Sequence, residues 1–192
     1  PPAHVVDLPP APAPPQPDRP VAVRRPVDTP PRPAPTPSPK PRPRRDTAFG
    51  TDLAHAAEHW LEHTPKGFRN DCSGFVMASY DRAGEPVVGN TRSLWADAEA
   101  EKRTHARKRP DPGDLVFFDN TYDRNGNGRR DDPLTHIGIV LDVDDDGTIA
   151  VAHGGTSKGR TLLYMNLYTP AVRRDDEGLI RNDYLRARRK GE

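Results

Sequence analysis

The spacing of apolar residues changes from a helical pattern to a strand pattern about halfway along the chain. Three segments in the earlier part have apolar residues three and four positions apart, and they predict helices over 51–63, 73–82 and 93–103. Pro65 follows the first of these segments and Gly84 follows the second, and both residue types commonly stop a helix. The earlier part of the folded chain is therefore expected to be helical.

The later part has short apolar runs separated by turn residues. Residues 114–119 follow a Pro-Gly turn, and residues 135–143 and 148–153 flank a turn of three aspartates and one glycine. Further strands are predicted over 160–167 and 179–185. Helices followed by an antiparallel sheet make an α+β fold.

Residues 1–45 differ in composition from the rest of the chain. They hold 18 of the 24 prolines and carry eight basic residues against three acidic ones. They have too few apolar residues to form a core, so we expect a disordered, extended tail with polyproline II character. This basic tail suggests a spacer that holds the rest near an anionic envelope surface, and a linker with no binding of its own is the alternative.

Residues 46–192 are long enough for one domain with a single core, and they carry 21 basic and 25 acidic residues. This acidic balance, without a basic stripe among aromatic residues, argues against nucleic-acid binding. No stretch of the sequence approaches the length of a membrane-spanning helix. The chain begins with proline, so we expect residue 1 to follow a removed signal peptide or an artificial cut. We expect a monomer that is secreted or lies in the cell envelope.

Cys72 is the only cysteine, which excludes an internal disulfide. It lies at the predicted start of the second helix, where unpaired N–H groups and the helix dipole favour a thiolate. A lone cysteine is more often a buried structural residue. Asp71 and Ser73 are unusual neighbours for an inert core thiol, however, so the sequence favours a nucleophile.

Among the seven histidines, two lie on apolar predicted strands. If Val143 pairs with Thr148 across the turn, Gly138 lies opposite His153. His153 then becomes a diagonal neighbour of His136, with roughly 5.5–8 Å between the bases of the two side chains. A slip of one residue in the pairing would separate them.

The remaining histidines are weaker candidates. His55, His59 and His63 recur every four residues, but they fall away from the apolar face of the first predicted helix. A solvated helix face therefore explains them better than a metal site does.

Three short motifs occur along the chain: DCSGFV at 71–76, PGDLVFF at 112–118 and HIGIV at 136–140. In this order they resemble the motifs of the NlpC-type cell-wall cysteine peptidases, a family with a papain-like fold that is related to the CHAP amidases. A fourth, weaker segment ends in His153, where the family has a third polar residue. The sequence therefore resembles this family between about residues 70 and 155.

The resemblance implies a mechanism and a substrate. Cys72 would attack an amide of a peptidoglycan stem peptide, commonly the bond after a γ-linked D-glutamate. His136 would be the general base and His153 would orient it. Asp71 and Ser73 match positions that in some members recognise a free amino group on the substrate. No cofactor is required for this chemistry.

The chain departs from the family upstream of Cys72. The usual aromatic and Gly-Gly motif, which carries an active-site tyrosine, is replaced by PKGFRN at 65–70. Two alternatives stay open for this reason. One is a CHAP-like amidase that cuts elsewhere in peptidoglycan, and the other is a wall-binding module that has lost turnover.

An insertion before His136 resembles the first part of a calcium-binding loop. Oxygen-bearing side chains occupy loop positions 1, 3, 5 and 9, and position 6 is a glycine. Position 12 is Leu134 instead of the usual bidentate glutamate. A structural calcium and a plain Asn/Gly-rich turn both fit this pattern. The candidate ligands are Asp123, Asn125, Asn127 and Asp131.

Overall fold

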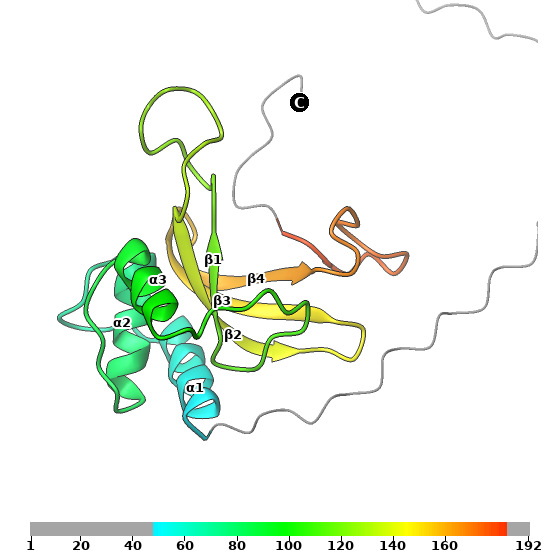
Figure 1. Cartoon of the computed structure of the whole chain (residues 1–192). Coiled ribbons are helices and arrows are strands. Elements are labelled where there is room, and N and C mark those ends of the chain that lie inside the picture. Colours follow the sequence, from blue (N-terminus) through cyan, green and yellow to red (C-terminus); the bar gives the residue numbers. More distant parts are fainter. Residues whose placement is uncertain (1–47, 184–192) are drawn as a thin grey trace, which may run out of the picture. The chain divides into compact units, whose positions relative to one another are not determined.

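The structure is a computed structural model, and it describes residues 48–183. The predicted tail over 1–45 lies outside the described residues, and so does its boundary with the domain. Within the described part, three helices precede four strands (Figure 1). The helices are α1 (Ala48–Glu62), α2 (Cys72–Arg82) and α3 (Thr91–Ala100). The strands are β1 (Leu115–Phe118), β2 (His136–Val143), β3 (Thr148–Thr156) and β4 (Gly159–Asn166).

The four strands form one antiparallel sheet in the order β1-β2-β3-β4, so each strand pairs with its neighbour in the sequence. The α+β fold predicted from the sequence is confirmed. In the part of the chain that the structure describes, no helix has both the length and the apolar character needed to cross a membrane.

The core lies between the helices and one face of the sheet, and Figure 1 shows the three helices together on that side. Each helix contributes apolar side chains that contact those of the central strands, so burial of this face joins the two layers. The buried residues of this core are Leu53, Ala57, Phe75, Val76, Leu94, Ile137, Ile139 and Ala152.

A β-bulge in β2 changes which residues share a face. Val140 pairs with Val151, but Asp142 pairs with Ala150, so β2 has one extra residue between these two pairs. Strict alternation along the strand would put Val143 on the face of Ile137 and Ile139, but the extra residue moves it to the other face. Val143 packs instead in a second cluster, whose buried members are Val140, Val143, Ile149, Val151 and Leu163.

The bulge also corrects an error in the predicted pairing. Val143 pairs with Ile149, one residue beyond the Thr148 that the turn predicted. Past the bulge, Ile139 pairs with Ala152, which is the predicted register. The one-residue slip at the turn and the extra residue of the bulge cancel. The part of the β2–β3 hairpin that carries the two histidines therefore keeps the predicted pairing.

Helix α3 begins two residues before the predicted start at Ser93. The side chain of Asn90 accepts hydrogen bonds from the N–H groups of Arg92 and Ser93, and the Ser93 hydroxyl accepts one from the N–H of Asn90. This reciprocal cap fixes the helix start. The apolar pattern could not locate it, because the first buried apolar side chain inside the helix is that of Leu94.

The last predicted strand, 179–185, is wrong over the described residues. Ile180 forms only an isolated bridge with Arg174, and the carboxylate of Asp175 accepts the N–H of Leu179. A tight turn over 175–178 precedes this segment, with Gly178 in the left-handed region at φ +84°. Residues 184 and 185 lie outside the described part.

Candidate active site

Cys72 is the first residue of α2, as the sequence predicted. Asp71 caps the helix, because its Oδ1 accepts a hydrogen bond of 2.6 Å from the N–H of Gly74. The thiol is partly buried, and its Sγ lies 3.9 Å from Oγ1 of Thr91. The thiol therefore lies at the positive end of the dipole of α2, next to the Thr91 hydroxyl at the start of α3.

Two glycines let neighbouring backbone approach the start of α2. A Cβ on Gly74 would lie 1.9 Å from the carbonyl oxygen of Arg69. A Cβ on Gly155, which has a φ of +74°, would lie 2.5 Å from the backbone nitrogen of Cys72. The loop before α2 and the end of β3 thus pack directly against the start of α2 and hold Cys72 in place.

His136 and His153 contact each other, as the hairpin argument predicted. Nε2 of His136 lies 2.9 Å from Nδ1 of His153, and the two rings are nearly perpendicular. Gly138 follows His136 by two residues in β2, and a Cβ there would lie 2.6 Å from Cγ1 of Val151 and 3.3 Å from the Cβ of His153. The absence of a side chain at this position thus leaves space for the histidine pair.

Burial sets the protonation of this pair. His136 is 6% exposed and His153 is 2% exposed. Burial, together with a smaller effect of the neighbouring His153, lowers the pKa of His136 to about 4. Burial also lowers the pKa of His153 to about 4, although the Asp183 carboxylate acts in the opposite direction. Both rings are neutral at neutral pH, so each has a nitrogen lone pair that can accept a proton or a hydrogen bond.

A cavity of about 730 Å³ brings the candidate residues together. It is lined by the starts of α2 and α3, by the loop between β1 and β2, and by the β3–β4 turn. Cys72 and His136 both line it, and His153 lies behind His136 through their hydrogen bond. The sequence-predicted residues in its wall are Asp71, Cys72, Ser73 and His136.

Asp71 and Ser73 already have partners inside the protein. The carboxylate of Asp71 caps α2 and forms an ion pair with Nε of Arg69 at 3.2 Å. The buried hydroxyl of Ser73 lies 3.4 Å from that of Thr91. Recognition of a substrate amino group by these two residues stays a prediction.

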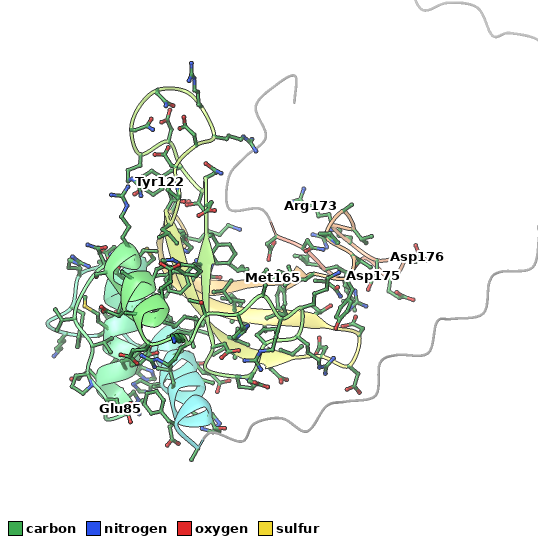
Figure 2. All side chains as sticks on the ribbon, viewed as in Figure 1. Glu85, Tyr122, Met165, Arg173, Asp175 and Asp176 are labelled. Carbon is green, nitrogen blue, oxygen red and sulfur yellow. The ribbon has the colours of Figure 1, made fainter. Side chains whose placement is uncertain are left out.

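The sequence reasoning missed several residues of the cavity wall. Thr91 and Arg92 belong to the capped start of α3, and the Asn90–Ser93 capping box was the signal that could have located them. Tyr122, which is 51% exposed, comes from the loop between β1 and β2 and is labelled in Figure 2. Its position depends on tertiary packing, for which the sequence offers no local signal.

The predicted calcium loop is closed by its own hydrogen bonds. The side-chain amides of Asn125 and Asn127 donate to the carboxylate of Asp131, and Oδ2 of Asp123 accepts the N–H of Gly128. The carbonyl oxygens of the two asparagines accept backbone N–H groups within the loop. Within residues 48–183, no three His, Cys, Asp or Glu side chains are grouped as a metal site would require. Calcium binding therefore stays a prediction.

Comparison with known proteins adds to this geometry. A family model described as the CHAP domain matches residues 63–155, a range that contains Cys72, His136 and His153. This match supports a CHAP/NlpC-type family of cell-wall peptidases for the domain. The arrangement of helices and antiparallel sheet is that of its papain-like α+β fold.

A curated relative supports the same family. It is described as "Probable endopeptidase p60" from Listeria grayi, and it is 27% identical to this chain over 128 residues. The aligned region is 60% of this chain but only 22% of that protein, so the chain spans about a fifth of the relative's length. No solved structure matches the chain.

Proposed function

We propose that this chain is a secreted or envelope peptidoglycan hydrolase that cleaves an amide bond of the stem peptide through Cys72. The observation that carries the proposal is the shared cavity. Cys72 at the start of α2 lines it together with His136, and His136 is hydrogen-bonded to the buried His153. A nucleophile, a neutral base and a group that orients the base are the three parts that such chemistry needs. The CHAP match supports peptidoglycan as the substrate.

The proton path determines which ring nitrogens carry hydrogen. Nε2 of His136 is occupied by the bond to His153, so the proton of the Cys72 thiol goes to Nδ1 of His136. For this transfer His136 carries its own proton on Nε2 and donates it to Nδ1 of His153. His153 therefore holds its proton on Nε2, and its lowered pKa keeps Nδ1 available as an acceptor.

The reaction then proceeds in two halves. The thiolate of Cys72 attacks the amide carbon, and the first-turn N–H groups of α2 stabilise the negative charge of the tetrahedral intermediate. The carbon–nitrogen bond breaks, and the leaving amine takes the proton from His136. Water then attacks the thioester while His136 accepts its proton, and this proton returns to the sulfur as the free carboxylic acid leaves.

Two alternative functions have specific observations behind them. The CHAP match favours an amidase that cuts between the glycan and the stem peptide, which would use the same cysteine and histidine. The missing tyrosine motif at 65–70 favours a wall-binding module without turnover. Tyr122, however, lines the cavity and offers a phenol hydroxyl in place of the one that the missing motif would carry. The hydrolase therefore remains our proposal.

Digestion of purified peptidoglycan, followed by mass analysis of the soluble fragments, tests the proposal. We expect fragments cut within the stem peptide, produced by the full chain and not by Cys72→Ala. Intact stem peptides freed from the glycan would support the amidase instead. Retention on the wall with no soluble fragments would overturn the hydrolase and support the binding module.

A further inference from the structure

The wall of the active-site cavity carries an excess of positive charge. Three arginines, Arg69, Arg92 and Arg124, line it against one acidic residue, Asp71. His136 adds no charge at neutral pH because burial keeps it neutral. A ligand in this cavity therefore meets a cationic surface, which favours an anion and disfavours an ammonium group.

Two of these arginines are tied to the protein. Arg69 forms an ion pair with Asp71 and donates a hydrogen bond of 2.8 Å to the carbonyl of Gly89. Arg124 donates to the carbonyl of Pro133 at 3.0 Å and lies 3.8 Å from the buried carboxylate of Asp132. They contribute charge to the cavity, but most of their geometry is fixed by internal partners.

Arg92 is different. It is exposed, and its guanidinium has no hydrogen-bonding or ion-pair partner among residues 48–183. It follows Thr91, whose hydroxyl lies 3.9 Å from the Cys72 sulfur, so its side chain starts close to the nucleophile. The backbone around it is fixed, because its own N–H donates to the side chain of Asn90. An unengaged guanidinium on a rigid helix start next to a nucleophile is suited to bind a carboxylate.

We propose that Arg92 binds a carboxylate of the substrate close to the scissile amide, so that the site selects acidic peptides over their carboxamide analogues. This inference rests on the proposed function, because it assigns the substrate class of the same cavity. Arg124 and the hydroxyl of Tyr122 line the same wall and add positive charge and a hydrogen-bond donor. A carboxamide offers no negative charge and only one acceptor oxygen, so it cannot form the paired, charged hydrogen bonds of a guanidinium and a carboxylate.

The test compares two soluble peptides that differ at one group. One is L-alanyl-γ-D-glutamyl-L-lysine, and the other carries a carboxamide in place of the free α-carboxylate of its glutamyl residue. Their dissociation constants are measured by calorimetry with the full chain carrying Cys72→Ala, so that neither peptide is consumed. We expect the acidic peptide to bind about 10- to 100-fold more tightly, as a charged hydrogen-bond pair would give.

Variants assign this preference to one side chain. In the Cys72→Ala background, Arg92→Gln should remove the preference, and Arg92→Lys should keep part of it. Arg103→Gln is the matched control, because Arg103 is exposed, pairs with Glu101 and does not line the cavity. It should leave both dissociation constants unchanged.

Equal binding of the two peptides, or a preference that survives Arg92→Gln, would overturn the inference. Binding and turnover separate the two proposals. If the unmodified chain cleaves the acidic peptide while the preference is absent, the hydrolase stands and the role of Arg92 falls. If the preference is present but no substrate is cleaved, carboxylate binding by Arg92 stands and the hydrolase falls.

Discussion

At the scale of single residues, the proposed chemistry depends on two histidines, His136 and His153, that are buried together and are both neutral at neutral pH. His136 can take a proton from Cys72 only while the His136 ring is neutral. His153 can orient that ring only while its own Nδ1 is free to accept a hydrogen bond from Nε2 of His136. Burial lowers the pKa of both rings to about 4, so this condition is met at neutral pH and well below it.

This lowered pKa predicts the acidic limb of the pH profile. We expect kcat/KM for a soluble stem peptide to stay near its neutral-pH value down to about pH 5 and to fall as the pH passes about 4. A limb near the ordinary histidine pKa of about 6.5 would contradict this account.

The same pKa values affect stability, which must be measured alongside the rate. In the unfolded chain both histidines regain the ordinary pKa, so protonation favours unfolding as the pH falls from about 6.5 towards 4. Neutral burial therefore stabilises the fold above that window, and the stabilisation is lost below it. Circular dichroism at each pH would separate loss of folded protein from loss of the base.

Substitution of His153 tests its role as a positioning residue. His153→Leu keeps an apolar side chain of similar size but removes the acceptor, so we expect kcat to fall by about 100-fold or more. His153→Gln retains a carbonyl oxygen that can accept from Nε2 of His136, and it should lose distinctly less. If the two variants lose the same activity, or if only KM changes, His153 serves packing and does not orient the base.

At the scale of elements, the sequence predicted the start of α2 and the pairing that brings the two histidines together. The predicted pairing of Val143 was wrong by one residue, but the bulge before Asp142 cancels this slip before the strands reach the histidines. A bulge leaves no clear mark in an apolar pattern, because one extra residue changes only the local alternation. The capping box at Asn90 and Ser93 could have located the helix start that carries Arg92, but it does not show that this start faces Cys72. Tyr122 has no local signal, because tertiary packing alone brings its loop to the cavity.

The cap of α2 gives a prediction at this scale. Asp71→Ala removes the acceptor for the N–H of Gly74 and should lower the free energy of unfolding by about 1 kcal/mol. Asp71→Asn keeps an acceptor oxygen and should lose much less. Urea denaturation of both variants checks this, and equal stability of Asp71→Ala and the unmodified chain would contradict the capping role.

The same pair of variants tests the predicted recognition of an amino group. If Asp71 binds a substrate ammonium, Asp71→Asn should raise KM for a peptide with a free N-terminus and leave its acetylated form unaffected.

At the scale of the whole molecule, the domain and the tail have opposite charge balance. Residues 1–45 carry a net positive charge, whereas residues 46–192 carry more acidic than basic residues. If fully extended in polyproline II, the tail would span on the order of 130–140 Å. Such a segment can hold a catalytic domain near an anionic envelope without taking part in its chemistry.

Deletion of residues 1–45 should separate these two roles. We expect unchanged hydrolysis of a small soluble stem peptide, together with weaker retention on whole sacculi at low salt, because the attraction is screened as salt rises. Loss of activity on the small peptide would show that the tail belongs to the folded site. Unchanged retention would reduce the tail to a linker.

The central claim, that Cys72 is the nucleophile of an amide hydrolase, is tested most directly by one time course. New amino groups released from purified peptidoglycan are counted for the unmodified chain and for Cys72→Ala, with both proteins shown to be folded by circular dichroism. The account predicts steady release by the unmodified chain and none above background by Cys72→Ala. Release at the same rate by Cys72→Ala would contradict it.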